Sequence, residues 1–345
     1  MVDRIKRDTS LDVIAGILVI YMILGHIFLW SHTQNSAFLT VLRRFFFFFM
    51  AFFFYKSGMF YKERPISESI KRGSNKLLLP FFFYTFVGEI VRWMRLYIIE
   101  GDTDWVHYLV YPIISIIGRG GPSGNTPLWF LLALFLTQLF VIFSSRLKMP
   151  KLLTFSIAFL LSYLGTLTNN NKISIPPIIW EVASGSIFFL CGNYLRELQY
   201  GKKAMLVALI IYICVIIFAP SYYDFRKGSI ESGYWIAYII SSISGIVLFV
   251  NFFKIPLLNK NCFCFVGKNS MQFFSFHWIL LDLVCLVGGY QILEHGKAFG
   301  SIFPVVPNFE MFSVLLLGCI LFLPIYAYGV ERLKNQHDSW LCKLL

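Results

Sequence analysis

Hydrophobic residues occur in long runs along the chain, and polar residues are confined to the short segments between them. Ten runs hold about 20 mostly apolar residues each, the length that a helix needs to cross a bilayer. They are 11–31, 42–61, 77–98, 128–145, 151–168, 178–196, 204–220, 234–253, 269–290 and 311–330. A weaker run at 105–117 is short and amphipathic, and we expect a re-entrant or interfacial helix there. The pattern predicts an all-α integral membrane protein, a bundle of about ten transmembrane helices.

The basic residues between the runs predict how the helices are oriented. If the N-terminus lies in the cytosol, 20 of the 30 Lys and Arg residues fall on the cytosolic side and 7 on the outer side. Cytosolic loops of membrane proteins carry such an excess of positive charge. We therefore expect both termini to be cytosolic, and an additional span at 105–117 would break the alternation.

Composition supports the same class and excludes others. Hydrophobic residues make up 57% of the chain and charged residues only 14%, whereas a soluble domain carries about a quarter charged residues. The net charge of +12 is explained by the cytosolic loops, so we expect no nucleic-acid partner. Most of the seven cysteines lie inside apolar runs, and Cys262 and Cys264 lack a second pair, which predicts no disulfide framework and no metal site. Without a long linker or an obvious repeat, residues 1–345 form one membrane-embedded domain.

Eight charged or titratable residues inside the apolar runs are candidates for a functional role. Such groups are costly in hydrocarbon, usually face the interior of a bundle and commonly mark function. They are His26, Lys56, Glu89, Arg92, Arg95, Glu181, His277 and Asp282. Most of them share the outer half of the expected bundle, so they indicate a polar cavity there.

Several of these residues also have a purely structural interpretation. Glu89 and Arg92 are spaced i, i+3, so they can pair on one helix face. Arg95 can extend its side chain to the outer interface, and Lys56 can extend toward the inner one. Glu181 can be interfacial and solvated. Asp282 can hold a neighbouring helix, and His277 can be a hydrogen-bonded packing residue rather than a catalyst.

His26 is the strongest catalytic candidate, because a neutral imidazole can take a proton from a hydroxyl near pH 7. A nearby carboxylate could orient the ring or stabilise its protonated form. The segment 118–127 is rich in glycine and supplies a flexible outer loop, which leads directly to Trp129. We expect Trp129 at the outer interface, either as an aromatic anchor or as a platform on which a sugar ring stacks.

Motifs along most of the chain resemble the membrane acyltransferase-3 family, bacterial O-acetyltransferases that act on surface glycans. The order and spacing of the motifs, rather than any one of them, carry the resemblance. They are Ser10-Leu11-Asp12 with Gly16 and Leu24-Gly25-His26, the Phe-rich segment ending in Lys56-Ser57-Gly58-Met59, 76–81, Pro127-Leu128-Trp129-Phe130-Leu131, 188–192, and 266–271 followed by Phe276-His277. The chain is most similar to the branch that resembles fucose 4-O-acetylases and lacks an extracytoplasmic hydrolase-like domain.

The resemblance implies an enzyme that moves an acetyl group from cytosolic acetyl-CoA to a sugar hydroxyl of an exported or lipid-linked glycan. It implies His26 as the catalytic base, aided by Glu89, with no metal and no cofactor beyond the acyl-CoA donor. The substrate-binding candidates are Arg92, Trp129, Asp282 and His277. The donor-binding candidates are Lys56, Ser57, Arg72 and Lys76. Direct transfer and an acyl-histidine intermediate on His26 are both compatible with the sequence.

One position departs from the family. Members often carry Arg eleven residues before the first-helix His, on the same helix face and about 16 Å away. That position is Ala15 here, so an anionic donor requires other cations, with Arg7 as a further candidate.

The main alternative is a secondary transporter or flippase for a glycan precursor, because charges at mid-membrane also mark transport pathways. A non-enzymatic partner in a glycan assembly complex is a second alternative. For the enzyme we expect the bacterial cytoplasmic membrane as its location and membrane lipid as its surroundings. The sequence does not predict an oligomeric state.

Overall fold

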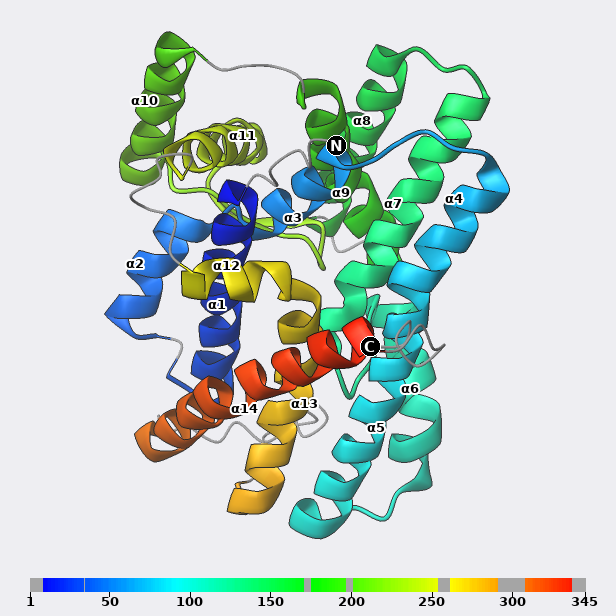
Figure 1. Ribbon diagram of the computed structural model, residues 1–345, viewed down its shortest axis with the longest axis vertical. Coiled ribbons are helices and arrows are strands. Elements are labelled where there is room, and N and C mark those ends of the chain that lie inside the picture. The colour runs from blue at the N-terminus through cyan, green and yellow to red at the C-terminus, as the bar shows by residue number, and fades with distance from the viewer. Residues whose placement is uncertain are drawn as a thin grey trace.

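The computed structural model describes residues 9–33, 35–170, 175–196, 201–253, 261–290 and 308–336. Within them the chain is almost entirely helical (Figure 1). The helices are α1 (Ser10–Trp30), α2 (Ala37–Phe46), α3 (Phe49–Met59), α4 (Ile66–Gly73), the π-helix η1 (Ser74–Leu78), α5 (Leu79–Glu100), α6 (Trp105–Arg119), the 3₁₀ turn η2 (Thr126–Leu128), α7 (Trp129–Arg146), α8 (Lys151–Asn170), α9 (Pro177–Leu195), α10 (Lys202–Phe218), α11 (Trp235–Phe252), α12 (Asn261–Lys268), α13 (Ser270–Gly288) and α14 (Phe309–Gln336).

Nine helical stretches among the described residues are long and apolar enough to cross a membrane. The run expected at 204–220 forms α10, which is apolar but only 17 residues long. The weaker run at 105–117 forms α6, a 15-residue helix with Pro112 inside it. An all-α integral membrane bundle is therefore confirmed. Which side of the membrane holds the termini stays a prediction, since residues 1–8 and 337–345 lie outside the described residues.

Two expected spans differ in detail from the hydropathy pattern. The run at 42–61 is divided at Phe47 and Phe48 into α2 and α3. Arg43 of α2 pairs with Glu231, whereas α3 packs against α9. The run at 77–98 begins earlier, because α4, η1 and α5 continue as one helical stretch from Ile66 to Ile99. Hydropathy begins that span too late because the first turns carry cations.

Glycines set the closest helix contacts of the core. A Cβ on Gly267 of α12 would lie 1.6 Å from the Asp12 carbonyl oxygen, and one on Gly16 of α1 would lie 2.1 Å from that of Phe263. On α3 and α9, Gly58 and Gly192 make equivalent backbone contacts. Small residues at such crossings allow backbones to pack directly in a membrane. The motif glycines are therefore packing residues that fix α12 on α1 and α9 on α3.

A short antiparallel hairpin of β1 (Tyr222–Asp224) and β2 (Ser229–Ser232) follows α10 and contains the only strands among the described residues. The alternation of spans does not predict it. Arg43 of α2 forms an ion pair with Glu231, and Phe225 at the tip of the hairpin is buried. The hairpin therefore folds back into the bundle instead of extending away from it.

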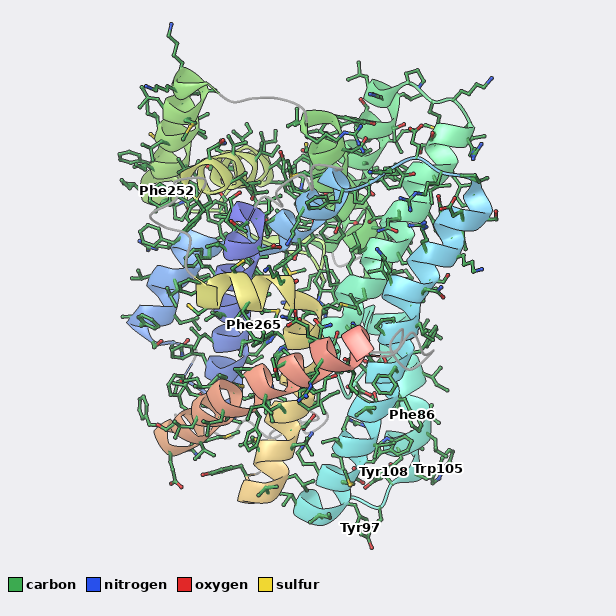
Figure 2. The ribbon with its side chains drawn as sticks, in the orientation of Figure 1. Phe86, Tyr97, Trp105, Tyr108, Phe252 and Phe265 are labelled. Carbon is green, nitrogen blue, oxygen red and sulfur yellow. The ribbon has the colours of Figure 1, made fainter. Side chains whose placement is uncertain are left out.

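Apolar side chains cover much of the outer surface. Figure 1 shows α5 and α6 side by side at one end of the long axis, with α8 and α10 at the other end. Phe86, Tyr97 and Trp105 project from the α5–α6 end (Figure 2), and their side chains are 64%, 67% and 64% exposed. Exposed aromatic and aliphatic groups of this density are expected where a protein faces lipid and the membrane interface.

Candidate active site

His26 and His277 contact each other at the centre of the bundle. The Nδ1 atom of His26 on α1 lies 2.8 Å from Nε2 of His277 on α13. The two rings stack at 5.0 Å between centroids with an interplanar angle of 6°, and Trp278 packs edge-on against His26. His277 is fully buried, whereas His26 is partly exposed. We call these two residues the histidine pair.

Backbone geometry fixes how protons are placed on the histidine pair. Nδ1 of His277 lies 2.7 Å from the Phe274 carbonyl oxygen and 3.2 Å from that of Phe273. A carbonyl only accepts, so Nδ1 of His277 carries a proton and its Nε2, in the neutral ring, is an acceptor. His26 then donates from Nδ1, which leaves the lone pair on His26 Nε2. The arrangement makes Nε2 of His26 a proton acceptor.

Space adjoins His26 on its own helix. A Cβ added to Gly25 would meet no atom within 4 Å, in contrast to the tightly packed glycines described above. The position before His26 on α1 is therefore open, and the ring of His26 is itself partly exposed, whereas His277 is fully buried.

A cavity of about 440 Å³ lies between α1, α3, α4, η1, α7 and the start of α13. Five cations line it, and no carboxylate among the described residues does so. They are Lys56, Lys62, Arg64, Arg72 and Lys76. We call this space the basic cavity. All four residues predicted to bind the donor, which are Lys56, Ser57, Arg72 and Lys76, line it.

The cations of the basic cavity are held in place by local acids. Lys56 lies 3.4 Å from Asp12 at the start of α1, and Arg72 lies 3.0 Å from Glu68 one turn earlier on α4. Lys76 lies in η1, the π-helical segment. A π segment changes the register of a helix and is often found at functional sites. Here Arg72, Gly73, Lys76 and Leu77 all line the same cavity.

The basic cavity extends to the histidine pair. Its apolar lining includes Met22, four residues before His26 on α1, and Phe274, three residues before His277 on α13. Residues at these spacings occupy one helix face, one turn apart and about 5 Å along the axis. The cavity therefore joins a cation-rich region near Asp12 to a position one helical turn from His26.

Glu89 and Arg92 form the ion pair that their spacing predicts, at 3.5 Å. Glu89 accepts hydrogen bonds from Ser123 Oγ and from the backbone N–H of Gly124, each at 2.6 Å. Arg92 donates to the His107 carbonyl oxygen. The sequence suggested that a carboxylate would orient the ring of His26. His277 contacts Nδ1 of His26 instead. A catalytic role for Glu89 stays a prediction.

The glycine-rich segment 118–127, predicted to be a flexible loop, is pinned on both sides. Glu89 of α5 holds Ser123 and Gly124, and Asn125 donates from Nδ2 to the Ser275 carbonyl oxygen on α13 at 2.8 Å. Ser275 is two residues from His277. The loop therefore connects the Glu89–Arg92 pair to the helix that carries one half of the histidine pair.

Asp282 and Arg95 form a second buried ion pair, with Nε of Arg95 at 2.8 Å from Oδ1 of Asp282. Arg95 is only 1% exposed, so the expectation that it reaches the interface is wrong. The pair ties α5 to α13 five residues after His277. Hydropathy cannot show this, because it does not indicate which face of α5 meets α13. Binding of substrate by Asp282 stays a prediction.

Trp129 is buried, with 7% of its surface exposed, so its side chain does not face lipid as an aromatic anchor would, and its position at the outer interface stays a prediction. Its ring contacts Phe130 and the hairpin residue Phe225. The reason is the hairpin, which covers this part of α7. Stacking of a sugar on Trp129 stays a prediction.

Sequence reasoning missed Arg226, which it counted only as a basic residue of an outer loop. Arg226 follows Phe225 at the tip of the hairpin and interacts electrostatically with both His26 and Glu181. Glu181 has no exposed surface, so the expectation of a solvated interfacial carboxylate is wrong. The signal in the sequence is the aromatic residues of this otherwise polar loop, which include Tyr222, Tyr223 and Phe225.

No group of His, Cys, Asp and Glu side chains among the described residues has the geometry of a metal site. Ala15, at the position where the family often has Arg, is buried with no exposed surface. Arg7 lies outside the described residues.

The histidine pair thus lies one helical turn from the lining of a cation-rich cavity. The family model described as an acyltransferase domain, that of the acyltransferase-3 family, matches residues 8–329. The chain belongs to the acyltransferase-3 family. This acyltransferase is a multi-pass membrane protein, as the nine long apolar helices within its described residues indicate. Comparisons with curated proteins and with solved structures gave no match.

The family match covers the residues that form the histidine pair and the basic cavity. Residues 8–329 include all of α1 and α13, so the histidine pair and the basic cavity both belong to the acyltransferase domain. The motif containing Leu24-Gly25-His26 and the one ending in Phe276-His277 are 251 residues apart and meet in the folded acyltransferase.

Proposed function

We propose that this acyltransferase moves an acetyl group from acetyl-CoA to a sugar hydroxyl of a surface polysaccharide or its lipid-linked precursor, in the bacterial cytoplasmic membrane. The observation that carries the proposal is the basic cavity, which five cations line and whose lining also includes residues one helical turn from the histidine pair. Family membership supports the transfer of an acyl group. The identity of donor and acceptor is our inference.

The basic cavity matches the chemistry of a coenzyme A thioester. Such a donor has a phosphate-bearing nucleotide at one end and a long, largely uncharged arm that ends in the thioester. Lys62, Arg64, Arg72 and Lys76 would bind the phosphates, since Arg and Lys favour these anions. The arm would pass Phe130, Leu131 and Leu134, which line the same cavity, and would bring the thioester to His26.

His26 supplies the base that the reaction needs. Its Nε2 lone pair takes the hydroxyl proton of the acceptor while the hydroxyl oxygen bonds to the thioester carbonyl carbon. The C–S bond then breaks, and the thiol of coenzyme A leaves with the proton that His26 held. His277 accepts from Nδ1 of His26 throughout and stabilises its protonated form. An acyl-histidine on His26 is the second route, and it uses the same lone pair.

A radiolabel experiment tests the proposal. The purified protein is reconstituted in vesicles with acetyl-CoA labelled in the acetyl group and with the surface polysaccharide fraction from a strain that lacks the gene. We expect label on the polysaccharide, reduced about 10²- to 10⁴-fold by His26→Ala. His32→Asn is the matched control: His32 follows the same helix and has a φ of 58°, which Asn tolerates.

The result separates the enzyme from its alternatives. Transfer that persists in His26→Ala would contradict the role of His26. Absence of transfer by the native protein, together with movement of glycan precursor across the vesicle membrane, would favour the transporter. Absence of both would favour a non-enzymatic partner.

A further inference from the structure

Glu181 is a carboxylate buried inside the bundle without a hydrogen-bond donor. It lies in the first turn and a half of α9 and has no exposed surface. Neither Oε1 nor Oε2 accepts a hydrogen bond within the part of the chain that the structure describes. Buried polar atoms are almost always hydrogen-bonded, and each exception requires an explanation. A ligand that donates to both oxygens is one such explanation.

Two backbone segments converge on this carboxylate. A Cβ on Gly120 would lie 2.6 Å from Oε1 of Glu181, so the backbone of the glycine-rich segment is in direct contact with the acid. Gly120 and Gly228 both have positive φ, at 74° and 62°, which glycine adopts without strain. Gly228, at the tip of the hairpin, packs against Trp180, the residue before Glu181. The carboxylate therefore lies where the hairpin tip and segment 118–127 meet α9.

The hairpin positions Arg226 beside this carboxylate. Asp224 accepts hydrogen bonds from the backbone N–H groups of Arg226 and Lys227, at 2.9 and 3.2 Å, and forms an ion pair with Lys227 Nζ at 3.3 Å. Phe225 anchors the tip by stacking on Phe54. The hairpin therefore directs two neighbouring cations differently: Lys227 pairs with Asp224 near the surface, and Arg226 interacts electrostatically with Glu181 and His26.

Glu181 and the basic cavity lie toward opposite ends of α9. Asn193, near the C-terminal end of α9, donates to the Gly58 carbonyl oxygen, next to the cavity-lining Ser57. Glu181 is twelve residues earlier, about 18 Å along the helix axis. Arg226 interacts electrostatically with both Glu181 and His26. Arg226 therefore links His26 to Glu181, which lies far along α9 from the basic cavity where the donor is proposed to bind.

We propose that Glu181 and Arg226 form the acceptor subsite of this enzyme and bind a polyhydroxyl substrate, such as a pyranose with neighbouring hydroxyls. Glu181 accepts hydrogen bonds from the hydroxyls next to the reactive one, and Arg226 donates to a ring or hydroxyl oxygen. These contacts place the reactive hydroxyl at Nε2 of His26. The subsite rests on the proposed acyl transfer, and no bond is made or broken at it.

The test is a comparison of acceptor and donor kinetics. Labelled acetyl-CoA and the polysaccharide fraction from the strain without the gene are used with Glu181→Gln and Arg226→Gln. We expect the KM for polysaccharide to rise about 10- to 100-fold, while the KM for acetyl-CoA and the acceptor-independent hydrolysis of acetyl-CoA change less than about twofold. Arg226→Lys keeps the charge and is expected to recover part of the loss. Lys227→Gln, one residue away, is the matched control and is expected to behave as the native protein.

The Tm in detergent reports whether each variant is folded, independently of either activity. An unchanged KM for polysaccharide in both Gln variants overturns the subsite. A parallel fall of hydrolysis and transfer in the folded Arg226→Lys variant also overturns it, because Arg226 would then serve the donor or the bundle. Absence of both activities in the native protein is a different result, because it contradicts the proposed function itself.

Discussion

Nδ1 of His26 lies 2.8 Å from Nε2 of His277, and the Phe274 carbonyl oxygen accepts from the far side of the second ring. This chain of hydrogen bonds runs from the backbone of α13 to the reactive face of α1. A single carbonyl thereby determines which nitrogen of His26 is the base. His277 thus acts through His26 and is a positioning residue in the proposed reaction.

Replacement of His277 tests this relay. In His277→Gln, the amide oxygen can accept from Nδ1 of His26, whereas in His277→Leu nothing can. We expect kcat to fall about 10-fold in the Gln variant and about 10²-fold or more in the Leu variant, with KM for both substrates unchanged. Steady-state kinetics on reconstituted protein measure this. Equal losses in both variants would show that His277 serves packing alone.

Replacement of cations in the basic cavity tests donor binding. Arg72→Gln and Lys76→Gln remove charges that are expected to contact the phosphates of coenzyme A. Because Arg72 is half exposed, screening by solvent limits its effect, and we expect the KM for acetyl-CoA to rise about three- to tenfold. Acetyl-pantetheine, which lacks the nucleotide, should be used equally well by these variants and by the native protein.

The control for that experiment is Lys202→Gln, because Lys202 is an exposed basic residue at the start of α10 and does not line the basic cavity. A similar change in KM with Lys202→Gln would indicate a general effect of surface charge. A loss with acetyl-pantetheine that matches the loss with acetyl-CoA would count against binding of phosphate in this cavity.

The Arg95–Asp282 pair predicts a double-mutant result. Removal of one partner leaves a buried charge without its counterion, which costs about 3–5 kcal/mol, whereas replacement of both by apolar residues is often neutral. We expect Asp282→Leu and Arg95→Met each to lower the Tm in detergent, and the double variant to recover most of the loss. An intact Tm in both single variants, with a raised KM for polysaccharide in Asp282→Leu, would favour binding of substrate by Asp282.

The contact between α1 and α12 predicts that Gly267 cannot become alanine without moving a helix. The added Cβ would lie 1.6 Å from the Asp12 carbonyl oxygen. Asp12 pairs with Lys56 at the basic cavity, so Gly267→Ala is expected to lower the Tm and to raise the KM for acetyl-CoA. Gly329→Ala on α14 is the matched control, because its Cβ meets no atom within 4 Å. A native Tm for Gly267→Ala would mean that α12 is free to shift.

Much of the bundle follows from hydropathy, because each span buries its own backbone hydrogen bonds and needs only length and apolarity. The donor candidates Lys56, Arg72 and Lys76 could be placed together because charged loops on one side of a membrane are neighbours in space. The i, i+3 spacing of Glu89 and Arg92 gave their ion pair directly. These features follow from the length and apolarity of each span, the charge of the loops and the spacing of residues, all of which can be read from one sequence.

Contacts that depend on which face of a helix meets which neighbouring helix could not be predicted from the sequence. Arg95 was expected at the surface because hydropathy does not reveal which helix faces it, and α13 supplies Asp282 there. The contact of His26 with His277 depends on the pairing of the first and penultimate long helices. Arg226 enters the site because a polar loop folds back as a hairpin, which neither periodicity nor charge bias indicates.

The depth of the basic cavity bears on where a membrane voltage acts. A voltage falls across material that excludes mobile ions, whereas space that ions enter stays near the potential of the adjoining solution. Because the basic cavity reaches Met22, ions that enter it would approach to within one turn of His26, and a membrane voltage would then fall over the protein beyond that turn. A proton or an anion that moves along α1 past that turn would therefore respond to the membrane voltage.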